Sequence, residues 1–168
     1  VDGSNFLKGA QIPATGWVFS QDFGVSGSFT YNSSGELPTT KLFKLHGLTE
    51  GQELQKTVKV SIEDIYAPAD TFTTYGSFTV SIREIDDDDL NPKYLERFVN
   101  VNLDPTSPHY ISKVIGDKYT EWDYTDKRFI EYGTYDNKSR CVRVEVAANV
   151  EAASVEASCL PFGYYGPQ

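Results

Sequence analysis

The sequence contains no methionine, only two cysteines and two histidines, and no apolar run long enough to cross a membrane. A membrane-spanning helix needs about 20 consecutive apolar residues, so we expect no membrane partner. Cys141 and Cys159 lie far apart in sequence, and with His46 and His109 they do not make the spacing of a zinc site. The pattern favours two free thiols and leaves a disulfide open.

Basic residues are also scarce, with 15 Lys and Arg against 24 Asp and Glu, which gives a net charge of −9. Phosphate contacts require clustered Lys and Arg, so this balance excludes nucleic acid as the expected partner. The missing methionine predicts that a translation start lies outside these 168 residues. We therefore expect an internal piece of a longer protein.

Aromatic residues, in contrast, are abundant, with 11 Tyr, 10 Phe and 2 Trp, and they favour β-structure. Alternation of apolar and polar residues predicts strands, and it is clearest where Val58, Val60 and Ile62 alternate with polar neighbours. The expected strands span residues 41–46, 56–65, 78–83, 98–103 and 140–147, with weaker candidates at 118–124 and 128–132. The predicted fold class is α+β, mainly β: an antiparallel β-sandwich or barrel-like domain with one or two short docked helices.

The chain divides by composition near residue 40. Residues 1–40 are rich in Gly, Ser, Thr and Asn, which predicts a loop or an irregular hairpin. Aromatic side chains in this region, including Trp17, Phe23 and Phe29, indicate that it packs against the rest. Residues 41–168 form the expected β-rich core domain, and the two parts together are expected to make one compact domain.

One helix is predicted after residue 106. Ser107 is a suitable N-cap, Pro108 suits the first helical position, and Gly116 suits a C-terminal stop. An apolar stripe lies on one face between them, at Tyr110, Ile111, Val114 and Ile115. A second short helix is predicted from Asn91-Pro92 through Arg97, and residues 150–158 fit either a helix or a strand.

The acidic run at Asp86–Asp89 invites a test for a calcium loop. An EF-hand loop that begins at Asp87 requires Gly at its sixth position and Glu at its twelfth. Pro92 and Phe98 occupy those positions, so the match fails. We expect a solvated turn after a strand, and a looser calcium site in an extracellular module stays open as an alternative.

Catalytic motifs are missing. Neither His46 nor His109 lies in a recognisable nucleophile context, and the sequence has no G-x-S-x-G and no phosphate-binding loop. We therefore expect no enzyme and no cofactor. A carbohydrate-binding adhesion module is the other alternative, and it requires Trp17, Trp122 and several Tyr on one exposed face.

An ordered set of motifs between residues 77 and 116 resembles the tail sheath proteins of contractile-tailed bacteriophages. A strand of the form F-T-V-x-[IV]-R is followed by E-x-F-x-N-[LV]-x-L-D-P and then by [NH]-Y-[IV]-x-x-[VI]-[IL]. Residues 42–51, 58–62 and 160–167 are similar to flanking segments of that family. The motif and core residues are Phe78, Val80, Ile82, Phe98, Leu103, Asp104, Pro105, Pro108, Tyr110, Ile111, Val114, Ile115 and Gly116.

One departure from the family pattern is that Glu53-Leu54-Gln55 stands where many sheath proteins carry Trp-Gly-Asn, which indicates a divergent member. The resemblance implies a mechanical role: subunits assemble helically around a tail tube and contract to drive it through the host envelope. It implies other sheath subunits and the tube as partners. It also implies localisation in the virion tail, after assembly in the host cytoplasm. A fragment without the terminal arms of the family is expected to be monomeric.

Overall fold

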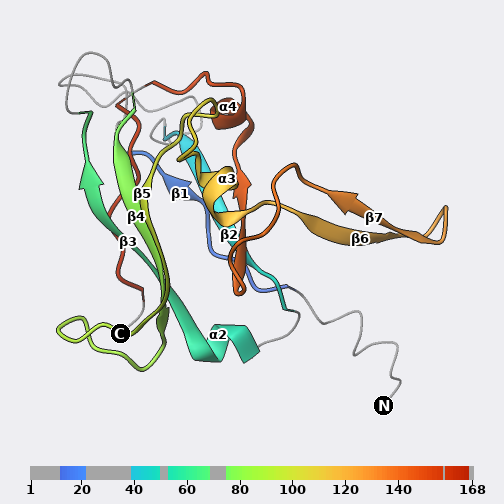
Figure 1. The fold of residues 1–168 in the computed structure, drawn as a ribbon, viewed down its shortest axis with the longest axis horizontal. Coiled ribbons are helices and arrows are strands. Elements are labelled where there is room, and N and C mark those ends of the chain that lie inside the picture. The colour runs from blue at the N-terminus through green and yellow to red at the C-terminus, as the bar shows by residue number, and fades with distance from the viewer. Residues whose placement is uncertain (1–11, 22–38, 50–52, 69–74, 157, 167–168) are drawn as a thin grey trace, which may run out of the picture.

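The computed structural model describes residues 12–21, 39–49, 53–68, 75–156 and 158–166. Two three-stranded antiparallel sheets and one two-stranded hairpin account for the strands (Figure 1). In chain order the elements are β1 (Val18–Phe19), β2 (Lys41–Gly47), α2 (Glu53–Thr57), β3 (Val58–Tyr66), β4 (Ser77–Glu84), β5 (Tyr94–Val101), α3 (Ile111–Ile115), β6 (Tyr119–Asp123), β7 (Arg128–Tyr132), β8 (Val142–Val146) and α4 (Ala148–Glu151).

The core lies between the two three-stranded sheets, whose strand orders are β1-β2-β8 and β3-β4-β5. In the first sheet, Leu45 pairs with Val144, and in the second Ile62 pairs with Val80. The sheets meet where Phe43 of β2 stacks on Phe78 of β4, with ring centroids 5.7 Å apart. The prediction of a mainly β fold with short helices is confirmed, and the sheets do not close into a barrel in the described part of the chain.

The helix after residue 106 is shorter than predicted, because α3 begins at Ile111, with Tyr110 as its N-cap. The assignment of Ser107 as cap and of Pro108 as first helical residue is therefore wrong. The Ser107 hydroxyl instead accepts hydrogen bonds from the Asn102 side chain and from the His109 amide. These bonds hold residues 102–109 in a turn. The predicted end is confirmed: Gly116 is the C-cap, with φ 108°.

The short helix predicted from Asn91 through Arg97 is also wrong, because this segment leads into β5. Pairing with β4 determines its structure, with Phe98 opposite Val80 and Glu96 opposite Ile82. An exposed helix of that length has little stability of its own, whereas a strand gains main-chain bonds from its neighbour. A helix that was not predicted, α2, precedes β3. Helix α4 includes only the first two residues of the ambiguous segment 150–158, and the other described residues of that segment are neither helix nor strand.

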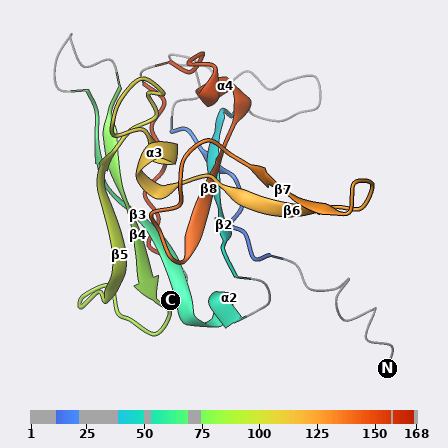
Figure 2. The same cartoon turned by 45° about the vertical axis from the view of Figure 1, so that its right-hand side comes forward.

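The two weaker strand predictions are confirmed as β6 and β7, and these strands form a hairpin that extends away from the packed sheets (Figures 1 and 2).

Most of residues 1–40 lie outside the described residues, Phe23 and Phe29 among them. Trp17 does pack against the core. Cys141 and Cys159 are free thiols, as predicted, but only Cys159 is buried, and Cys141 is partly exposed. No helix in the described ranges is both long and apolar enough to cross a membrane.

Candidate functional site

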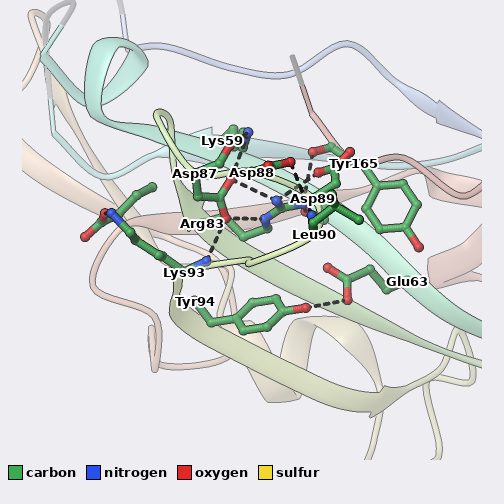
Figure 3. Close-up of polar contacts among 12 residues, drawn as sticks. Lys59, Glu63, Arg83, Asp87, Asp88, Asp89, Leu90, Lys93, Tyr94 and Tyr165 are labelled. Atoms are coloured by element: carbon green, nitrogen blue, oxygen red, sulfur yellow. Dashed lines mark hydrogen bonds and ion pairs between the residues drawn. The ribbon is translucent and has the colours of Figure 1, made fainter. Parts of the chain in front are cut away.

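A buried cluster of charged side chains lies where the turn after β4 folds back on β3 and β4 (Figure 3). Asp87 is at its centre. Its two carboxylate oxygens accept hydrogen bonds from Arg83 Nε and Nη2 at 2.7 and 2.8 Å. Lys59 Nζ lies 2.8 Å from the same carboxylate, and the Lys93 amide donates to it at 2.7 Å. The side chains of Lys59, Arg83 and Asp87 are at most 1% exposed.

The cluster balances its charges. Lys59 and Arg83 supply two positive charges, and Asp87 and Asp89 supply two negative charges, with Arg83 Nη2 2.9 Å from Asp89. The Arg83 guanidinium holds the pKa of Asp87 well below its ordinary value, and Asp87 raises the pKa of Arg83 in turn. Both groups therefore stay charged throughout the physiological range, which suits a structural ion network and not proton transfer.

This arrangement corrects the prediction that Asp86–Asp89 is a solvated turn. Asp86 and Asp88 are exposed, but Asp87 is buried and Asp89 is partly covered. Burial is tolerated because each buried charge has an opposite charge and hydrogen bonds. A calcium ion at this turn has to compete with Arg83 and Lys59 for the Asp87 carboxylate. Within the described ranges, no group of three or more His, Cys, Asp or Glu side chains is placed to hold a metal ion.

The alternation predicted for residues 56–65 and 78–83 puts Lys59 and Arg83 on the polar faces of their strands and indicates no further role for them. Part of a signal for their role in the cluster is in the sequence, and the rest requires the strand register. Lys59 and Arg83 are directly opposite each other across β3 and β4, and like charges in that position destabilise a sheet. Their burial requires nearby acids, and the acidic run begins three residues after Arg83.

The predicted motif residues form a second group, distributed over β4, β5 and α3. Phe78, Val80 and Ile82 are fully buried on β4, and Ile111 and Ile115 are fully buried on α3. Leu103 and Tyr110 are also buried, and Phe98 and Val114 are half-buried. The structure therefore brings these apolar motif residues into one core.

The polar part of the motif lies elsewhere, in the turn between β5 and α3. The Asp104 carboxylate accepts hydrogen bonds from the Thr106 amide and hydroxyl, and the Pro105 carbonyl accepts one from Lys113 Nζ at 2.6 Å. Pro108 is exposed. Gly116 returns the chain to the sheet, because its carbonyl accepts the Val144 amide at 2.9 Å. A side chain at Gly116 collides with Asn137, so glycine is required there.

Aromatic side chains gather on the β6–β7 hairpin. Tyr119 stacks on Tyr132 with centroids 5.2 Å apart, and Trp122 meets Phe129 edge-on at 4.8 Å. Both are directly opposed cross-strand pairs. The Arg143 guanidinium lies 4.2 Å from the Tyr119 ring and connects the hairpin base to β8. Phe129 is 70% exposed, so the outer part of the hairpin presents aromatic surface to solvent.

The two histidines lie in different surroundings, His46 on β2 and His109 in the turn before α3. His46 Nε2 hydrogen-bonds the Glu145 carboxylate at 2.6 Å, and Lys44 shares that carboxylate at 3.1 Å. His109 is exposed in the turn before α3. The contacts of His46 tie it to the neighbouring strand β8 of the first sheet. Comparisons of the chain with protein-family models, with curated proteins and with solved structures found no match.

Proposed function

We propose that this chain is part of a structural subunit of the contractile tail sheath of a bacteriophage. The observation that carries the proposal is the ordered set of sheath-like motifs from Ser77 to Gly116. Those residues form one unit of β4, β5, the following turn and α3. The apolar motif positions of the unit are core residues, so they serve the fold.

The proposed role is mechanical. A sheath subunit transmits force between neighbours, which requires a domain that keeps its shape while its surroundings move. The buried cluster at Asp87 supports this, because it joins β3, β4 and the turn between β4 and β5 through charge-assisted hydrogen bonds. Neighbouring subunits in an open helix make heterologous contacts. Exposed features such as the β6–β7 hairpin offer surface for them.

The proposal places the protein in the phage tail, after assembly in the host cytoplasm, with other sheath subunits and the tail tube as partners. It needs no cofactor and no catalytic step. To test it, the complete reading frame that contains this chain is expressed and its product is viewed by electron microscopy. We expect hollow helical tubes from the complete protein and a monomer from the 168-residue chain in sedimentation experiments. A complete protein that stays monomeric with isolated tail tubes present contradicts the proposal.

A carbohydrate-binding module is the second candidate, and one observation favours it. A hollow of about 370 Å³ on the hairpin is lined by aromatic and polar side chains: Glu121, Trp122, Asp123, Tyr124, Thr125 and Tyr132. Trp17, which this candidate also requires, packs against the core and beneath Lys44 instead. Binding on a glycan array that is lost in Trp122→Ala and kept in Trp17→Phe supports this candidate over the sheath.

A further inference from the structure

We name the C-terminal segment from Phe162 to Gly166 the strap. It lies along the edge of β3 and continues a segment that contacts the chain next to β1. Before it, Pro161 bridges to Ser20 next to β1, and the Gln21 amide donates to the Leu160 carbonyl at 2.8 Å. Within it, Tyr164 pairs with Ile62 of β3 through two main-chain hydrogen bonds of 2.6 and 3.0 Å. The chain therefore connects the edge of one sheet to the edge of the other.

The two ends of this connection are held differently. Cys159 and Pro161 are buried, so the segment before the strap is anchored by its side chains. In the strap itself, Phe162, Tyr164 and Tyr165 are each about half exposed. Its polar contacts include the main-chain pair with Ile62 and a long contact of 3.5 Å from Arg83 Nη1 to the Tyr165 carbonyl. Because these side chains are already about half exposed, lifting the segment exposes less apolar area than opening a fully buried one.

The strap also forms one wall of an apolar cavity. The cavity has a volume of about 590 Å³ and is lined by strap residues Phe162, Gly163 and Tyr164 together with residues around β1 and on β3. Trp17, Val18, Val60 and Ile62 are among the other residues that line it. Movement of the strap exposes this cavity and the outer edge of β3 without breaking either sheet.

We propose that the strap is a conformational device that detaches as a unit while both sheets stay folded, and so controls access to the cavity between β1 and β3. The hinge is the junction with the anchored segment at Pro161. At the far end, Gly166 packs closely against β3 while the strap is closed. It has φ +80°, and a Cβ there lies 3.1 Å from Lys59 Cβ and from the Val60 carbonyl. This inference does not depend on the proposed function.

The test is native-state hydrogen exchange on the 168-residue chain, followed by NMR. The amides of Ile62 and Tyr164 are bonded across the strap. Amides alternate in direction along a strand, so those of Ser61 and Glu63 point to β4 and serve as internal controls. After correction for intrinsic rates, we expect the amides of Ile62 and Tyr164 to exchange at similar rates. Both should exchange at least tenfold faster than the amides of Ser61 and Glu63. Equal protection of all four amides overturns the proposal, because the strap then opens only with the whole domain.

Two glycine variants sharpen the test. Gly166→Ala forces a left-handed alanine against β3, and we expect it to speed exchange at Ile62 and Tyr164 about five- to thirtyfold while Ser61 and Glu63 are unchanged. Gly163→Ala is the matched control, because a Cβ there meets nothing closer than 3.7 Å. An unchanged rate in Gly166→Ala, or equal acceleration of all four amides, contradicts the proposal.

Discussion

The charge cluster at Asp87 and the β6–β7 hairpin differ from the usual pattern in opposite ways. Charged side chains are normally exposed and aromatic ones normally buried, but here the cluster is buried and the hairpin exposes an aromatic ring. The cluster buries Lys59, Arg83 and Asp87 almost completely, whereas the hairpin leaves Phe129 largely exposed. Polarity alone therefore does not decide burial in this molecule. Charges are buried where each one has an opposite partner, and aromatic side chains stay exposed where two strands have no third layer to pack against.

The largest loss of stability is expected from a substitution in the hydrophobic core. Ile111 of α3 is fully buried, and Ile111→Asp places an unpaired carboxylate there. We expect this variant not to fold, as judged by loss of near-ultraviolet circular dichroism and of dispersed NMR signals. His109→Asp is the control, because His109 is exposed two residues earlier. A cooperative unfolding transition of wild-type stability in Ile111→Asp contradicts the assignment of α3 to the core.

The next variant breaks the cluster. Asp87→Asn removes the charge that pairs with Arg83 and Lys59 and leaves two cations buried. We expect a large drop in the urea midpoint, with Asp88→Asn close to wild type, because Asp88 is exposed. If the two variants unfold at the same urea concentration, the cluster does not stabilise the fold.

The same pair predicts a pH dependence. Arg83 lowers the pKa of Asp87 below its ordinary value of 3.8. The ionised carboxylate therefore stabilises the fold above about pH 4, and this contribution is lost as the pH falls further toward the lowered pKa. We expect the stability difference between wild type and Asp87→Asn to be constant from pH 5 to 8 and to shrink below about pH 4. A difference that grows on acidification contradicts the assignment of the shift to Arg83.

A moderate effect is expected at Leu103, which follows β5 and is 2% exposed. Leu103→Ala removes three buried carbons and leaves a cavity, so we expect a loss of about 2–5 kcal/mol in the free energy of unfolding. Urea titration measures this. A loss below about 1 kcal/mol means that the turn before α3 collapses onto the cavity or that Leu103 is not part of the core.

The smallest effect is expected on the hairpin. Phe129→Ala removes the cross-strand partner of Trp122, a contact worth roughly 0.2–1 kcal/mol. We expect the loss to stay local, with faster exchange of hairpin amides and an unchanged global midpoint. A global loss as large as that of Leu103→Ala shows that the hairpin belongs to the cooperative core and removes the contrast between the two regions.

The regular parts of the fold could be predicted from the sequence. Strict alternation from Val58 to Ile62 and from Phe78 to Ile82 marks two strands. The apolar residues of the second strand and Ile62 are buried in the core, and Val58 and Val60 are partly buried against it. The errors occurred where tertiary contacts outweigh local signals. Asn91-Pro92 has the features of a helix start, yet pairing with β4 makes the following segment a strand. Ser107 suits a helix cap, yet Asn102 and the His109 amide engage its hydroxyl in a turn.

The candidate site was harder to predict, because its burial depends on two strands and a turn that meet only in the folded chain. The outward position of Arg83 in its strand indicates a solvated side chain until Asp87 folds back over it. The hairpin shows the opposite case: its strands were predicted, but its projection away from the sheets depends on connections that no local pattern describes.

The proposed place of this chain in a contractile sheath can be tested directly on phage particles whose genome encodes it. Antibodies raised against the 168-residue chain are applied to intact tails and to tails with the sheath contracted, and bound gold is located by electron microscopy. The proposal predicts gold along the whole sheath, with the labelled length shortened after contraction. Gold confined to fibres, to the capsid or to the bare tube contradicts it.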